Sequence, residues 1–214
     1  MDRFGMFASG ALALLASSVA RLAAQDAAAK TRAATIQRLE KFVAQVEGEG
    51  DRHDGRLTED DFDLLADAQV NLEGFTPDDA ARLLAGLRFV HSLRDDELSV
   101  VEEYTLAKGG EELRFVMLPA FVQRLPLDRV AKVIVAAATD LPEESRSYGI
   151  WKLWGTCYER RDDYYGMTRD LSLELMRLFE SGTDADRKVI AGIFGKPGMT
   201  KADLPALRVR ATKG

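Results

Sequence analysis

The chain has 214 residues, of which 46% are hydrophobic, so it is apolar enough to form a folded core and too apolar to be disordered over its body. Its formal net charge of −6 excludes the broadly basic surface through which proteins bind nucleic acid non-specifically, so we expect no nucleic-acid partner. A single cysteine, Cys157, excludes an intrachain disulfide, and no histidine stands near it in the sequence. We expect it to be an inert core thiol.

The first element in chain order is an uncharged, mostly apolar run over residues 4–20, between Arg3 and Arg21. Such a run is too costly to leave in water, so it must be cleaved off, held in a bilayer or buried against protein. We therefore divide the chain into an N-terminal hydrophobic segment, residues 1–25, and a single helical domain, residues 26–214.

Three interpretations of the N-terminal segment remain open. Small residues before Arg21 and before Gln25 suit the cleavage of a secretory signal peptide. As an uncleaved membrane anchor, the run lies at the short limit of what spans a bilayer, which allows membrane contact through residues 4–20. Phe7, Leu14 and other apolar residues also recur at helical spacing, which is typical of a helix that docks on protein.

The next element is an amphipathic helix over about residues 27–47, because Ile36, Leu39 and Val43 form one apolar stripe. The apolar run joins this stripe in helical register. If the run is retained, the sequence predicts one long helix that projects from the body.

Helix starts are marked further along the chain by threonine with an acidic residue three positions later. The pattern begins at Thr58, Thr76, Thr183 and Thr200, and Pro77 adds a favourable first helical residue. Apolar periodicity predicts further helices over 95–108, 127–139 and 162–180, and another that opens at Pro142. Residues 111–125 are ambiguous between a short strand and a helix broken at Pro119.

The fold class that these elements predict is all-α. We expect a compact multi-helix bundle of about seven to nine helices, with an N-terminal hydrophobic helix and short connections between antiparallel neighbours.

One loop carries a motif with possible chemistry. The segment DGRLTEDDF, which begins at Asp54, resembles the second half of the calcium-binding loop of the EF-hand family. The resemblance implies a sharp turn at Gly55 and a calcium ion held by Asp54 and Asp61. The segment departs from the family at the first and third ligand positions, Gly50 and Arg52, and by an aspartate where the family closes the site with glutamate. The alternative is a polar turn followed by a capped helix.

A second segment combines aromatic and arginine side chains, the types that anchor protein interfaces. We predict that this segment binds a protein partner through Tyr158, Arg160, Arg161, Tyr164 and Tyr165. Trp151 and Trp154, which fall on one helix face with Tyr158, are expected to pack in the core.

Catalytic motifs are missing from the sequence: there is no glycine-rich phosphate loop and no nucleophile elbow. The two histidines, His53 and His91, are isolated, which argues against a histidine zinc site.

We predict a non-catalytic helical interaction or structural protein with no cofactor, associated with the cell envelope or forming a subunit of a larger assembly. The alternatives are a calcium-responsive helix–loop–helix module and a carboxylate-based enzyme on a helical scaffold. The predicted location is the cell envelope or a secreted or periplasmic state; the alternative is a membrane-anchored protein or a member of a larger protein complex.

Overall fold

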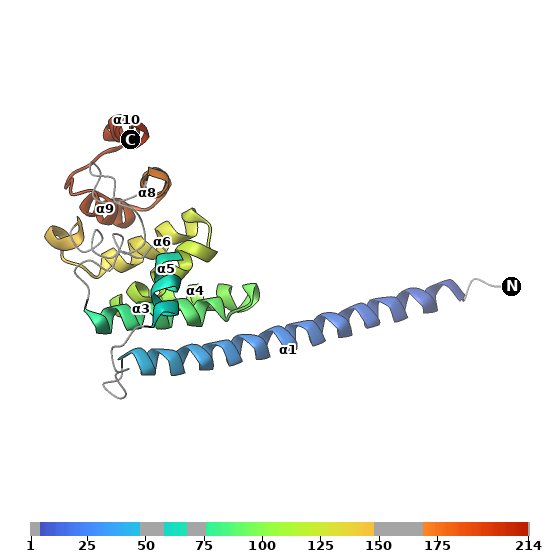
Figure 1. Ribbon diagram of the computed structural model, residues 1–214. Coiled ribbons are helices and arrows are strands. Elements are labelled where there is room, and N and C mark those ends of the chain that lie inside the picture. The colour runs from blue at the N-terminus through green and yellow to red at the C-terminus, as the bar shows by residue number, and fades with distance from the viewer. Residues whose placement is uncertain (1–4, 48–57, 68–75, 148–168, 214) are drawn as a thin grey trace.

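The computed structural model describes residues 5–47, 58–67, 76–147 and 169–213, and for residues 5–20 it describes the backbone alone. All the regular structure in these ranges is helical, so the predicted all-α fold is confirmed (Figure 1). The described α-helices are α1 (Gly5–Glu47), α2 (Glu59–Asp67), α3 (Pro77–His91), α4 (Asp95–Ala107), α5 (Glu111–Arg124), α6 (Leu127–Thr139), α8 (Arg169–Ser181), α9 (Asp184–Ile193) and α10 (Leu204–Lys213). Two short 3-10 helices, η1 (Glu143–Ser145) and η2 (Lys201–Asp203), complete the set.

The threonine–acid pattern marks helix starts, as predicted. Thr76 is the N-cap of α3, and its hydroxyl oxygen accepts the backbone N–H of Asp79 at 3.2 Å while the Asp79 carboxylate accepts the N–H of Thr76 at 3.2 Å. The same reciprocal capping box opens α9 at Thr183 and η2 at Thr200, and the pair of Thr58 and Asp61 opens α2 in the same way. Each box satisfies N–H groups that have no partner within the helix.

The ambiguous segment after residue 110 is a single helix, α5, with Pro119 inside it, and the strand alternative is wrong. The helix expected to open at Pro142 begins with the 3-10 turn η1, and the two described residues that follow, Arg146 and Ser147, are α-helical. The described part of the helix expected over 162–180 begins at Arg169.

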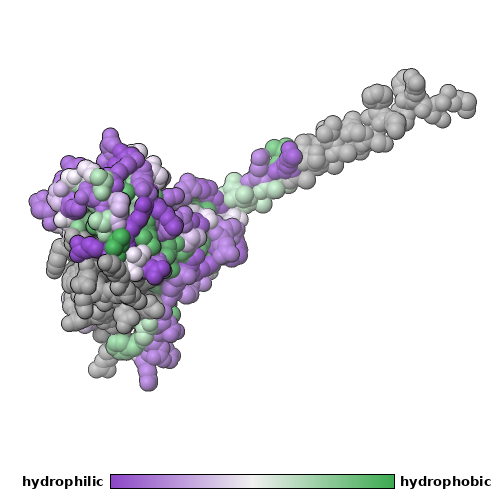
Figure 2. Space-filling view, turned by 90° about the horizontal axis from the view of Figure 1, so that it is seen from above, coloured by the Kyte–Doolittle hydropathy of each residue, from purple (hydrophilic) through white to green (hydrophobic). Residues whose placement is uncertain are grey.

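The helices of the body stack in an order that follows the chain. α3 packs on α5, α5 on α6, α6 on both α8 and α9, and α8 on α10. In Figure 1, α1 lies along the bottom of this stack and α10 at the top. One cluster of buried apolar side chains runs from Leu39 in α1 to Ala211 in α10, and hydrophilic residues cover much of the described surface (Figure 2).

Arginine side chains close the C-terminal ends of four helices, where the last carbonyl groups have no partner within the helix. These arginines are Arg124 at the end of α3, Arg114 at the ends of α4 and α6, Arg146 after α6, and Arg187 at the end of α8. The guanidinium of Arg114 is the most buried example: it donates to the carbonyl oxygens of Thr105, Leu106 and Ala136 at 3.1–3.2 Å and to the Asp140 carboxylate at 2.6 Å. A cation placed there also meets the negative end of each helix dipole.

Two helices of the stack approach closely at Gly86, where α3 crosses α5. A Cβ atom at Gly86 would collide with the carbonyl oxygen of Val116 and would stand 2.8 Å from the Cγ1 atom of Val116. Glycine is required at this position because the α5 backbone occupies the space that a side chain would need.

We predict that Gly86→Ala lowers the free energy of unfolding by about 1–3 kcal/mol, because α3 and α5 must move apart to admit the methyl group. Urea denaturation measures the change. The matched control is Gly110→Ser at the N-cap of α5, where nothing lies within 4 Å of the added Cβ, and this variant is expected to be as stable as the wild type or more stable. Equal stability of all three proteins would contradict the close crossing.

Candidate functional site

Helix α1 divides into an outer and a docked half, and the docked half makes the most extended polar contact with the body. Every residue from Arg21 to Lys30 is exposed, and Leu22 is 65% exposed. From Thr31 onward one face turns inward: Thr35, Leu39, Phe42 and Val46 are all less than 9% exposed. Their spacing of three and four residues places them on one side of the helix.

The apolar part of the docking contact is centred on an aromatic pair. The rings of Phe42 in α1 and Phe89 in α3 are stacked, with centroids 4.5 Å apart and planes inclined by 20°. Leu39, one turn earlier, is fully buried. These side chains hold the docked half of α1 to the body through the hydrophobic effect.

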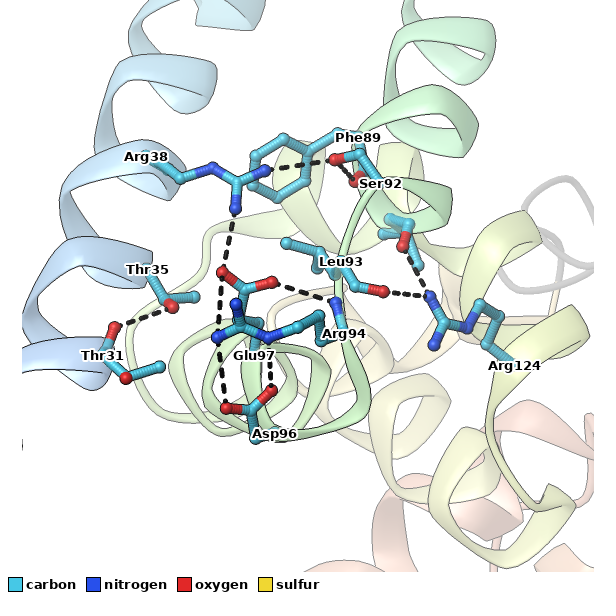
Figure 3. A network of polar contacts seen from close by, with 11 residues as sticks. Thr31, Thr35, Arg38, Phe89, Ser92, Leu93, Arg94, Asp96, Glu97 and Arg124 are labelled. Carbon is cyan, nitrogen blue, oxygen red and sulfur yellow. Dashed lines mark hydrogen bonds and ion pairs between the residues drawn. The ribbon is translucent and has the colours of Figure 1, made fainter. Parts of the chain in front are cut away.

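The polar part of the contact is a network at the corner between α3 and α4 (Figure 3). Arg38 of α1 donates to the Glu97 carboxylate at 3.0 Å and to the Ser92 hydroxyl at 3.2 Å. The other oxygen of Glu97 accepts the backbone N–H of Arg94 at 2.9 Å. Glu97 therefore does two things at once: it closes the first turn of α4 and receives the guanidinium of α1.

Arg124 of α5 supports the same corner. It donates to the carbonyl oxygen of Leu93 at 2.7 Å (Figure 3), to that of Val90 at 2.9 Å and to the Asp95 carboxylate at 2.8 Å. The corner that receives α1 is thus fixed by α5.

A second ion pair lies at the point where α1 leaves the body. Arg32 donates two hydrogen bonds of 2.8 Å to the two carboxylate oxygens of Glu103 in α4. The hydrogen bonds from the Arg32 guanidinium, together with its charge, hold the pKa of Glu103 below the ordinary value of a glutamate. Bidentate pairing fixes direction as well as distance, so this pair orients the helix where its contacts with the body begin.

The calcium site expected from the EF-hand resemblance involves residues that the structure describes only in part. Asp54 lies outside the described residues. Asp61 is buried, and its carboxylate accepts the N–H of Thr58 at 2.8 Å and forms an ion pair with Arg88. A metal ion at Asp61 would have to compete with this guanidinium, and calcium binding by Asp54 and Asp61 stays a prediction.

The partner-binding segment predicted from Tyr158, Arg160, Arg161, Tyr164 and Tyr165 lies outside the described residues, as do Trp151, Trp154 and Cys157. Interface binding through this segment also stays a prediction.

A carboxylate-based enzyme would need a buried carboxylate that is not already paired, and the described part of the chain contains none. Its three buried carboxylates belong to Asp61, Glu97 and Glu102, and each is paired with an arginine. Glu102 accepts hydrogen bonds from Arg129, one of them at 2.9 Å. The described residues also contain no group of three or more histidine, cysteine, aspartate or glutamate side chains placed to hold a metal ion.

The residues that clamp α1 were visible in the sequence, but their pairing was not. Arg32 and Arg38 stand on the polar flanks of the apolar stripe, and Glu97 and Glu103 belong to an acid-rich segment. Arg38 and Glu97 are 59 positions apart, and Arg32 and Glu103 are 71 apart. No local signal joins partners at such separations.

Comparisons of the chain with protein-family models, with curated proteins and with solved structures each found no match. Among the described residues, no helix is both long enough and apolar enough to cross a membrane.

We predict that the stability difference between the wild type and Glu103→Gln depends on pH. A carboxyl group whose pKa is lowered by folding contributes stability above its ordinary pKa, and this contribution disappears as the pH falls through the lowered value. The wild type should therefore have the higher urea midpoint at neutral pH, and the two midpoints should converge in acid.

The control is Glu40→Gln, an exposed position on α1 with no ion pair to the described residues. Its difference from the wild type should stay constant over the same range. A constant difference for Glu103→Gln would show that the pair with Arg32 does not form.

For the calcium prediction, Arg88→Gln offers a direct test. Removal of the guanidinium takes away the positive charge that pairs with the Asp61 carboxylate, so calcium affinity should rise in this variant relative to the wild type. Isothermal titration calorimetry with calcium in the millimolar range measures the difference. Absence of heat with both proteins would end the calcium hypothesis.

Proposed function

We propose that this protein is a non-catalytic interaction or structural protein of the cell envelope, or of a larger assembly, whose helical body is held at a distance from its attachment point by α1. The observation that carries the proposal is the division of α1 into a clamped half and an exposed half. One half of the helix packs against its own domain and the other half is exposed. Such a helix is suited to holding the domain at a fixed distance from another structure.

The clamped half supports this role because it is held by two kinds of contact. The buried side chains of Leu39 and Phe42 give the stabilisation, and the ion pairs of Arg32 and Arg38 give the direction. A tether attached in this way sets the orientation of the body as well as its distance.

The exposed half supports the role through its composition. Residues 21–30 receive no stabilisation from burial, so the helix there depends on local terms. Alanine, the strongest helix former, dominates the segment, and Asp26 and Lys30 form an i,i+4 ion pair at 2.9 Å. At 1.5 Å per residue, this segment separates residue 20 from the body by about 15 Å.

The attachment point in this proposal is the uncharged run over residues 4–20. Its side chains lie outside those described, so the proposal rests here on the sequence. A bilayer or the apolar surface of a partner protein would remove the run from water. Cleavage as a signal peptide is the competing outcome, and it would leave the contacts of residues 31–46 in place.

The non-catalytic part of the proposal is supported by how the described charges are used. The three buried carboxylates of the described residues pair with arginines, and other arginines there cap helix ends. Charges paired in this way serve the architecture, and none of these three carboxylates is left unpaired for acid–base chemistry.

We predict that the protein expressed in bacterial cells is retained in the membrane fraction after a high-salt wash and is released by detergent. Replacement of Leu14 and Leu15 by arginine should move it to the soluble fraction, because charges near the middle of the run are costly in a bilayer. The matched control replaces Ala28 and Ala29 by arginine in the exposed half, and it should remain with the membrane.

Mass spectrometry of the purified protein decides the competing outcome. A first peptide that begins at Met1 or Asp2 agrees with a tether. A first peptide that begins at Arg21 or Gln25 refutes the tether and leaves a secreted or periplasmic protein.

A further inference from the structure

Two short helices of the body each expose a large apolar side chain beside charges of one sign. Phe62 in α2 is 50% exposed and Val209 in α10 is 49% exposed. Together with Leu22 they are the large hydrophobic side chains most open to solvent among the described residues. Side chains of this size at the surface mark contact sites when neighbouring residues extend them into a face.

The outward face of α10 is such a face. Leu204, Leu207 and Ala211 point into the body, whereas Pro205, Ala206 and Val209 are exposed. The helix is therefore apolar on both sides, which is unusual for a helix at the surface. α10 lies at the top of Figure 1 and thus on the near side of Figure 2, where hydrophobic residues reach the surface among hydrophilic ones.

Among the described residues, the charged side chains next to α10 that have no ion pair are positive. Arg210 and Lys201 are exposed, and neither has an ion pair with the described residues. Arg208 is half exposed and pairs with Glu180 at 2.6 Å.

The outward face of α2 has the opposite charge. Leu65 and Asp61 point into the body, whereas Phe62 and Ala66 are exposed one turn apart. The exposed acids that border them are Glu59, Asp60, Asp63 and Asp67. α2 packs on α3 and α10 packs on α8, so the two faces belong to different parts of the stack.

We propose that α10 of one copy of this protein docks on α2 of a second copy. Apolar side chains meet at the centre of the contact, and the positive rim of α10 meets the negative rim of α2. The helices also match in length, because nine and ten residues give about 14 and 15 Å. Complementary charge identifies a second copy as the occupant, since each chain carries both halves of the contact.

The contact is heterologous, so it does not close on itself. Each docked copy still presents one free α2 and one free α10, and association continues into a row or closes as a ring. Two helices of this length bury less than the roughly 1,200 Å² of a standard interface, so the contact is weak and salt-sensitive. The inference stands whether or not residues 4–20 attach the protein to a membrane.

Sedimentation velocity of the full-length protein in mild detergent tests the proposal. The wild type should sediment faster as its concentration rises at low salt and should return to one slow species at high salt. Two variants each alter one face: Asp63→Lys with Asp67→Lys on α2, and Lys201→Glu in η2 with Arg210→Glu in α10. Each alone should associate at least about tenfold more weakly, because like charges then face one another.

Mixing the two variants supplies the decisive result. The intact α10 face of the first fits the intact α2 face of the second, and the two reversed faces carry opposite charges as well, so the mixture should regain the association that neither variant shows alone. A chain that carries all four substitutions has exchanged the charges at these four positions of its two faces, and it should recover part of the self-association.

Matched controls are Glu40→Lys and Lys132→Glu, exposed charges on α1 and α6, which should behave as the wild type. Circular dichroism verifies that every variant is folded. A wild type that stays a single species at all concentrations overturns the proposal, as does a mixture that associates no more than either variant alone. Association that survives in both single-face variants overturns it as well, because another surface must then hold the copies together.

Discussion

The need to satisfy carbonyl groups at helix C-termini shapes most of this protein. A stack of short helices creates many such ends, and arginines donate to them in four of the described helices. Arginine answers the need because its planar guanidinium has five N–H donors and keeps its charge when it is buried. Arg114 shows the principle most fully, since one side chain joins the last turn of α4, the last turn of α6 and the Asp140 carboxylate. Such a side chain caps two helices and also fixes their relative position.

The unpaired N–H groups at helix starts and the unpaired C=O groups at helix ends find hydrogen-bond partners in different ways here. This difference determines which features of the fold can be predicted from the sequence. A start is capped by residues within four positions of one another, as at Thr76 and Asp79, so its signature is local and was read correctly. An end is capped by an arginine from another helix, as Arg124 caps α3 from a position 34 residues after Val90. The all-α class and most helix starts were therefore predictable, whereas the packing of the stack was not.

The ambiguous segment around Pro119 illustrates the same limit. Its run of apolar residues suits a strand as well as a buried helix, and proline counts against both. α5 crosses α3 at Gly86 and lies within the stack, so burial on several sides explains the lack of a clear stripe. The clamp on α1 was hidden for a related reason: Arg32 and Arg38 have the spacing of ordinary solvent-facing residues until α4 is placed against them.

Because α1 continues without a break from the body outward, its length sets both the separation of its two ends and the rotation of one end relative to the other. In an α-helix each residue advances the chain by about 1.5 Å and turns it by about 100°. One residue added to or removed from the exposed segment would thus barely alter the separation of the two ends, yet would rotate one against the other by more than a quarter of a turn. In the tether that we propose, the number of residues from Arg21 to Lys30 therefore sets the angle of the body about the helix axis, and with it the side of the body that would face the attachment point.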